Sequence, residues 1–190
     1  MQRRAMMMTV SVAAAALALA GCSTNKGASA TPAEKQAEIN RAVDQTIATL
    51  YSSVPGSREL VAKATGVLVF PSVYQAGFGI GGEYGEGALR VNGVTTGYYS
   101  TAAGSFGFQA GAQSKALVYL FMTQEALDKF QKSSGWTAGA DASVSLIKLG
   151  ANGTIDSNSV SNSVNAFALT NAGLFGGVSL NGSKISKKDF

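Results

Sequence analysis

The sequence contains no histidine, one cysteine and three prolines among its 190 residues. Without histidine, neither a serine–histidine–aspartate triad nor a histidine-ligated metal centre can form. With Cys22 as its only cysteine, the chain has no internal disulfide, so a hydrophobic core must stabilise its fold. These absences remove the commonest catalytic centres, and the sequence predicts a protein that is not an enzyme and uses no cofactor.

Charged residues make up only 14 % of the chain, and the carboxylates among them form no evident site. Glu83 and Glu86 are three residues apart, a spacing that places them on opposite faces of a strand rather than side by side. This favours solvated or turn-facing side chains over an acid–base pair. Asp141, Asp156 and Glu125 show no spacing typical of metal ligands, so the sequence predicts no metal site.

The first residues have the pattern of an export signal. Arg3 and Arg4 precede an uncharged apolar run over residues 6–20, which is too short and too rich in small residues for a membrane span. The run ends in LAGC at residues 19–22, and polar residues follow. This arrangement resembles the lipobox of bacterial lipoprotein precursors, which implies cleavage before Cys22 and attachment of lipid to that residue. A chance free cysteine is the alternative.

The predicted organisation is a signal peptide over residues 1–21, a flexible tether over 22–31 and a single domain over 32–190. Two acyl chains suffice for stable membrane anchoring. Ser23 after the cysteine favours the outer membrane, by the sorting habit of such lipoproteins. Removal of Arg3 and Arg4 lowers the formal net charge from +4 to +2, which is poor evidence for nucleic acid as a partner.

The domain begins with an amphipathic helix. Thr31, Pro32 and Glu34 form a capping box with proline at the first helical position, and the helix is expected to end near Tyr51. Its apolar stripe consists of Ile39, Val43, Ile47 and Leu50. The stripe suits packing on the domain or on a bilayer, and the sequence leaves both open.

Two shorter helices are expected, one over residues 58–64 capped by Ser57 and one after Thr123. The rest is typical of strands. A buried strand over residues 66–70 is expected to stop at Pro71, and Asn92-Gly93 predicts a hairpin turn.

The remaining chain adds further strand patterns. Residues 135–149 predict a strand with Trp136 on its apolar face, 150–165 an exposed loop, and 164–183 a last strand pair before the charged end KISKKDF. The expected apolar face of the strand after Gly135 is Trp136, Ala138, Ala140, Ala142, Val144 and Leu146.

The stretch GFGIGGEYGEG lies at residues 77–87, and its first six residues match the G-x-G-x-x-G pattern of a dinucleotide-binding turn. That site requires a helix immediately after the glycines, whereas a strand pattern follows here, and two glutamates would repel phosphate. Related copies begin at Gly107 and Gly135, with a looser one at Gly173. This recurrence is typical of repeated strand units, and chance matches in a sheet protein rich in glycine and alanine are the alternative. The glycines on one face of this strand, which let another backbone approach closely, are Gly77, Gly79, Gly81 and Gly85.

The predicted fold class is therefore α+β, with N-terminal amphipathic helices packed on a strongly curved, mostly antiparallel, glycine-rich sheet or barrel. With these motifs in order, the chain resembles the SYLF family, also called an actin-binding family after its yeast members. The landmarks are AKATGVLVFPSVYQAGFGIGGEYGEGAL at 62–89, Tyr99-Ser100, GSFGFQAGAQS at 104–114, LVYLFMTQEALDKF at 117–130 and GLFGGVSLNGS at 173–183.

The resemblance implies lipid binding, with phosphoinositides bound by eukaryotic members and F-actin by fungal ones. A bacterial envelope lacks phosphoinositides as a normal component, so the expected partner is membrane phospholipid and actin is not expected. Membrane binding in eukaryotic relatives is attributed to a basic N-terminal segment. The equivalent helix here mixes lysine and arginine with glutamate and aspartate, which makes it a poor attractor for strongly anionic headgroups.

Three functional hypotheses follow: a membrane-anchored domain that binds phospholipid headgroups, an envelope protein that binds a protein partner and uses its lipid only as a tether, and a carrier that encloses an acyl chain. For each candidate basic residue the alternative is an ordinary solubilising charge. The candidates for headgroup binding are Lys35, Arg41, Arg58, Lys63, Lys184, Lys187 and Lys188.

Overall fold

The computed structural model describes residues 30–107, 113–157, 160, 162–171, 173–175 and 178–190, and Thr31–Phe190 form one compact unit. The expected signal peptide, the lipid attachment at Cys22 and all but the end of the tether lie outside the described residues. The helices are α1 (Pro32–Ser53), α2 (Ser57–Lys63) and α3 (Gln124–Lys132). The strands are β1 (Gly66–Val91), β2 (Val94–Gly107), β3 (Gln113–Phe121), β4 (Trp136–Thr137), β5 (Val144–Leu146), β6 (Val164–Thr170), β7 (Gly173–Leu174) and β8 (Lys184–Lys188).

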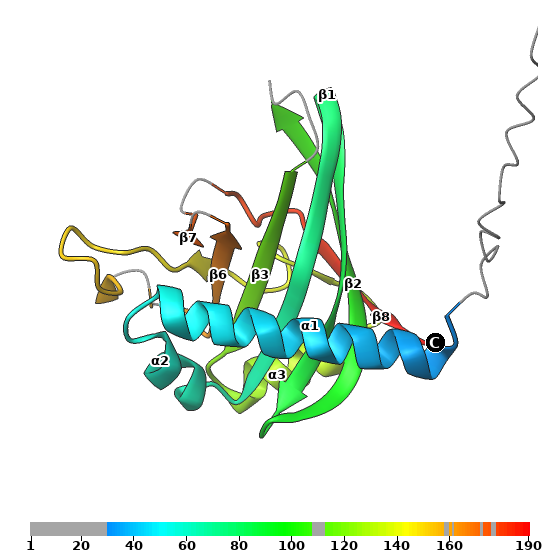
Figure 1. Cartoon of the computed structure of the whole chain (residues 1–190), viewed down its shortest axis with the longest axis horizontal. Helices are drawn as coiled ribbons and strands as arrows, with labels where there is room; N and C mark the ends of the chain where they lie inside the picture. The colour runs from blue at the N-terminus through cyan, green and yellow to red at the C-terminus, as the bar shows by residue number, and fades with distance from the viewer. Residues whose placement is uncertain (1–29, 108–112, 158–159, 161, 172, 176–177) are drawn as a thin grey trace, which may run out of the picture. The chain divides into compact units, whose positions relative to one another are not determined.

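The strands form one strongly curled sheet (Figure 1). Its order is β4-β8-β2-β1-β3-β6-β5, with β7 paired to β6, and every pairing is antiparallel except that of β5 with β6. The sheet curls through 247°, about half a barrel, and helices pack against it. This confirms the α+β prediction with a curved, mostly antiparallel sheet.

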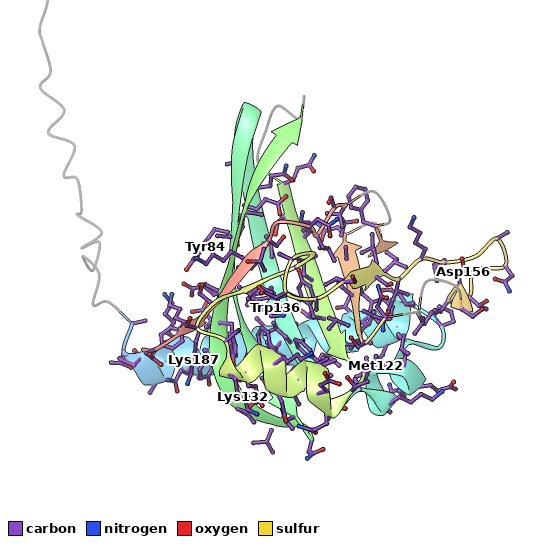
Figure 2. The ribbon with its side chains drawn as sticks, turned by 180° about the vertical axis from the view of Figure 1, so that it is seen from behind. Tyr84, Met122, Lys132, Trp136, Asp156 and Lys187 are labelled. Atoms are coloured by element: carbon purple, nitrogen blue, oxygen red, sulfur yellow. The ribbon has the colours of Figure 1, made fainter. Side chains whose placement is uncertain are left out.

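The concave side of the sheet holds an aromatic core. Trp136 from the first strand in the sheet order lies 6.3 Å, centroid to centroid, from Tyr119 on the fifth, a contact that requires the sheet to close around them. Phe121, at the end of β3, and Phe130, in α3, complete this cluster, and Figure 2 shows Trp136 within it. All four side chains are buried, so the concave side is filled with packed rings.

Helix α1 covers the opposite, convex side of the sheet. Its capping box is present: the Thr31 hydroxyl accepts from the Glu34 N–H at 3.3 Å, and the Thr31 N–H donates to the Glu34 carboxylate at 2.8 Å. The apolar stripe packs on the sheet, with Val43 and Leu50 fully buried. The stripe therefore belongs to the domain core rather than to a bilayer. Across the described part of the chain, no helix has the length and apolar character that a membrane crossing requires.

Strand β1 does not stop at Pro71, as the sequence pattern suggested. It continues across the proline with a register irregularity between Phe70 and Val73. Because proline has no N–H to donate, it fits in a strand at such a bulge. The prediction of a strand end at Pro71 was wrong because a bulge, rather than a turn, accommodates the ring.

Beyond this bulge, β1 turns back along itself. In a straight strand, Val69 and Gly87 would lie about 60 Å apart, at about 3.3 Å per residue. Instead, a Cβ atom added at Gly87 would overlap the carbonyl oxygen of Val69. One added at Gly85 would lie 2.8 Å from the Ser72 carbonyl oxygen. The return therefore lies near residue 78, midway between these partners.

The glycine stretch is thus part of a strand. No helix follows residues 77–82, since β1 continues to Val91 and pairs with β2 through the turn at Asn92 and Gly93, which have φ angles of 51° and 79°. Gly85, one of the four glycines predicted to admit another backbone, does so. The copy at Gly107 falls largely on residues outside the described part of the chain.

The predicted strand after Gly135 was wrong beyond its first residues. Trp136 and Ala138 are buried, but Ala140 is exposed in a turn where Gly139 has a φ of +86°. The Asp141 carboxylate closes that turn by accepting the Thr137 N–H at 2.6 Å. The alternating pattern therefore breaks at the turn, and β5 begins only at Val144.

Two smaller predictions also need correction. Ser57 is the first residue of α2 rather than its cap, which is Gly56, and its buried hydroxyl donates to the Leu50 carbonyl at 3.1 Å. The charged end KISKKDF contains β8, which pairs with both β2 and β4. By contrast, Thr123 caps α3 as predicted, accepting from the Ala126 N–H at 3.2 Å.

Candidate functional site: a groove between α1 and β1

A groove of about 280 Å³ lies between the first half of α1 and the convex face of β1. Its walls combine apolar, aromatic and charged side chains. Tyr74 and Tyr84 are unusually exposed for their size, at 63 % and 49 %. The residues that line this α1–β1 groove are Lys35, Glu38, Ile39, Ala42, Pro71, Ser72, Tyr74, Tyr84, Gly85 and Glu86.

The fold of β1 places both tyrosines at the groove. They lie on either side of the return near residue 78, one on each half of the strand, so the return brings them to the same wall. Successive side chains along a strand point to opposite faces. Val73, next to Tyr74, and Leu89, an odd number of residues from Tyr84, face the concave core. Tyr74 and Tyr84 therefore face α1, and Figure 2 shows Tyr84 projecting away from the sheet.

Glu86 collects three donors at one end of the groove. Its carboxylate accepts the Tyr84 hydroxyl at 2.8 Å, a hydrogen bond from the Lys188 ammonium, and a salt bridge from the Lys35 ammonium at 3.4 Å. The Phe190 ring lies 5.7 Å from the Lys35 nitrogen and 5.2 Å from that of Lys188, within reach of a cation–π interaction. We call these five residues the Glu86 cluster.

The cluster shifts the pKa values of its members in opposite directions. Partial burial alone would raise the pKa of Glu86, but hydrogen bonds from Lys188 and Tyr84, with the charge of Lys188, hold that pKa below its usual value. The Glu86 carboxylate in turn raises the pKa of Lys188. Burial and the same carboxylate raise the pKa of the Tyr84 hydroxyl. The first two shifts favour a charged Glu86 and a charged Lys188 at neutral pH, and the third favours the neutral Tyr84 hydroxyl that donates to Glu86.

The structure brings together two of the seven predicted headgroup residues, Lys35 and Lys188. Lys187 is exposed and, as the neighbour of Lys188 in β8, points to the opposite face of that strand. Lys184 is the first residue of β8. Arg58 of α2 stacks on Tyr51, near the C-terminal end of α1, at 4.3 Å, and Lys63 is the last residue of α2. The exposed Arg41 bonds its own helix, from Nε to the Ala37 carbonyl at 3.4 Å. Their roles in binding stay predictions, as does that of Cys22.

The prediction that Glu83 and Glu86 lie on opposite faces is confirmed. Glu83 points to the concave side, where it pairs with the Lys115 ammonium at 2.8 Å, and both side chains are largely buried. Glu86 points to α1 instead. Sequence reasoning treated Glu86 as a solvated charge and missed Tyr74, Tyr84 and Phe190 as members of a site. The i, i+2 pair of Tyr84 and Glu86 was the available signal.

The other acidic candidates have structural partners. Glu125 forms an i, i+4 salt bridge with Lys129 at 2.8 Å, and Asp141 closes the turn described above. Within the described ranges, no group of three or more histidine, cysteine, aspartate or glutamate side chains could hold a metal ion.

Residues 102–189 match a family model described as Ysc84, Las17-binding protein actin regulator. These residues, just under half of the chain, match the Ysc84, or SYLF, family. This confirms the resemblance seen in the sequence, and the SYLF family is one of binding domains rather than known enzymes. No curated protein matches the chain. The match includes Lys187 and Lys188 of β8, whereas the residues that line the groove all precede it.

Proposed function

We propose that this protein is a membrane-anchored lipoprotein whose SYLF domain binds phospholipid headgroups and catalyses no reaction. The observation that supports this most is the convergence of Lys35 and Lys188 beside the α1–β1 groove. These residues come from opposite ends of the domain sequence, and their ammonium groups can each donate to phosphate oxygens. The family's lipid- and actin-related partners support the same class of ligand.

The lipid anchor and the groove have different roles in this proposal. Lipid on Cys22 holds the protein at the membrane, because two acyl chains suffice for stable anchoring. The proposed location is the outer membrane. The domain binds headgroups with its surface side chains. The apolar stripe of α1 is buried against the sheet and is therefore not free to insert into the bilayer. The concave core is filled by packed aromatic rings, which does not favour a carrier that encloses an acyl chain.

A protein partner is the second candidate, and one surface feature favours it. The segment that includes Leu149 and Asp156 projects from the body of the domain (Figures 1 and 2), and Leu149 is 38 % exposed. In this alternative the projecting segment, with the Leu149 side chain exposed on it, is the surface that the partner contacts. The lipid would then be only a tether.

Flotation of residues 28–190 with liposomes tests the proposal, because this chain contains the whole compact unit but not Cys22. The vesicles contain phosphatidylcholine, phosphatidylethanolamine and phosphatidylglycerol together. The test variant is Lys35→Ala/Lys188→Ala. The matched control, Lys129→Ala/Lys132→Ala, removes the same charge from exposed positions of α3.

We expect the unaltered domain to float with the vesicles. A hydrogen bond to a charged group contributes about 1.5 to 3 kcal/mol, so the Lys35/Lys188 variant should bind at least about tenfold more weakly, and the control variant should bind normally. If the unaltered domain stays in the soluble fraction at low and high salt, headgroup binding is not its property and the protein partner becomes the better proposal.

A further inference from the structure

We infer that the α1–β1 groove selects the phosphoethanolamine headgroup, with its phosphate at Lys35 and its ammonium between Glu38 and the two exposed tyrosines. The inference rests on the proposed function and names the class of headgroup. It concerns residues that precede the part of the chain matched to the family model, so it follows from this groove alone.

The charges of the groove match a zwitterion. Lys35, Glu38 and Glu86 line the groove, and Lys188, which lies beside it and pairs with Glu86, brings the total to two positive and two negative charges. Glu86 is already occupied by both lysines and by the Tyr84 hydroxyl. Among the described residues, the exposed Glu38 forms no ion pair. A groove with balanced charge and one unneutralised carboxylate repels a purely anionic headgroup and attracts a ligand with a cationic end.

The tyrosines favour the same cationic end. Aromatic faces attract ammonium groups, and Tyr74 and Tyr84 stand exposed on the wall of the groove that faces α1 and Glu38. The Tyr84 hydroxyl donates its proton to Glu86, so its oxygen remains able to accept a hydrogen bond. A primary ammonium can donate to that oxygen and to Glu38, whereas a trimethylated ammonium has no proton to donate.

Lys35 is suited to the phosphate. Its side chain is 42 % exposed and lies 3.4 Å from Glu86, and an ammonium group carries three donors, so one partner does not exhaust it. Lys35 and Glu38 lie one turn apart on α1, which places a donor for phosphate and an acceptor for ammonium on the same helix face. At about 280 Å³, the groove is at the lower limit of ligand pockets, which suits a headgroup rather than an acyl chain.

The test separates the three headgroups by flotation of residues 28–190. One set of vesicles is pure phosphatidylcholine, and two further sets add phosphatidylethanolamine or phosphatidylglycerol. The variant is Glu38→Gln, and the control is Glu59→Gln, which makes the same chemical change at an exposed position of α2. Circular dichroism establishes that both variants are folded. Soluble glycerophosphoethanolamine and inorganic phosphate serve as competitors.

We expect the unaltered domain to bind phosphatidylethanolamine vesicles about tenfold more tightly than phosphatidylcholine vesicles, with glycerophosphoethanolamine competing better than phosphate. Glu38→Gln should remove that preference and leave binding to phosphatidylglycerol equal or stronger, because it removes a negative charge. A structural role for Glu38 would instead weaken binding to all vesicles. Glu59→Gln should bind as the unaltered domain does.

Two results would overturn the inference alone. Equal binding to phosphatidylcholine and phosphatidylethanolamine would show that no ammonium proton is recognised. A preference of the unaltered domain for phosphatidylglycerol over phosphatidylethanolamine would make the groove a site for anions, and the proposed headgroup binding would stand. Failure to bind any of the vesicles would overturn the inference and the proposed function together.

Discussion

The return of β1 along itself depends on Gly87, and replacement by alanine should destabilise the domain strongly. The added Cβ would overlap the Val69 carbonyl oxygen and lie 2.8 Å from both the Val69 carbonyl carbon and Cδ1 of Phe70. Carbon atoms in contact are normally about 3.5 to 4.0 Å apart. Two of these three neighbours are backbone atoms and Phe70 is fully buried, so relief requires the two halves of β1 to separate.

The magnitude follows from the cost of overpacking. Forcing extra atoms into a packed site costs about 1 to 3 kcal/mol, and backbone neighbours place Gly87→Ala at the upper end, about 3 kcal/mol. For a domain of this size, that loss lowers the melting temperature by about 6 to 12 °C. Gly104→Ala is the matched control in β2, because its added Cβ would meet nothing within 4 Å. It should stabilise the domain by about 0.5 to 1 kcal/mol, since glycine is unfavourable in a strand.

Thermal unfolding of residues 28–190, followed by circular dichroism, measures both effects. Gly87→Ala should melt well below the unaltered domain, and Gly104→Ala should melt at or slightly above it. If Gly87→Ala melted at the same temperature as Gly104→Ala, the close approach of the two halves of β1 would not exist. The explanation of the glycine stretch as a device for that approach would then be refuted.

The two ion pairs on the opposite faces of β1 give further predictions. Because Glu86 has a lowered pKa, its contribution to stability is present above the pKa of the unfolded chain and is lost as pH falls through the folded value. Lys188 has a raised pKa, so its contribution is lost as pH rises through the folded value. Glu86→Gln should therefore cost about 1 to 2 kcal/mol near pH 7 and much less at pH 3, as measured by urea unfolding at each pH; an equal loss at both would contradict the charged cluster. On the concave side, Lys115→Met should cost about 3 kcal/mol, because it leaves the largely buried Glu83 carboxylate unpaired. The double variant Lys115→Met/Glu83→Gln should recover part of that loss in the same assay, and a double variant no better than the single one would show that the pairing does not matter.

Local sequence signals were sufficient for α1 and for the turn between β1 and β2. The capping box at Thr31 and the stripe through Val43 predict α1, and Asn92-Gly93 predicts the hairpin turn, because each depends on residues within a few positions of one another. The stripe alone did not decide between a bilayer and the sheet, since both offer an apolar surface. Its packing partners lie in strands far along the chain.

The site needed contacts that the sequence does not display. Lys35, Glu86 and Lys188 come from α1, β1 and β8, and their meeting depends on β8 pairing with β2 beside β1. Sequence reasoning identified the two lysines as basic residues among seven. It could not separate them from Arg58 or Lys63, which belong to α2 beyond the C-terminal end of α1, because the distinction is one of tertiary position.

The glycines connect the fold to the groove. Gly85 and Gly87 allow the halves of β1 to approach, and that approach brings Tyr74 beside Tyr84, ten residues further along the chain, on the wall that faces α1. With larger residues at those glycines the halves would separate, and the groove would lose one of its aromatic walls. The glycine stretch at 77–87 thus shapes the groove through Gly85 and Gly87, which follow the part of it that resembles a nucleotide-binding turn. Under this reasoning, a Gly87→Ala domain that remained folded at low temperature would still bind phosphatidylethanolamine vesicles poorly, whereas Gly104→Ala would bind them normally.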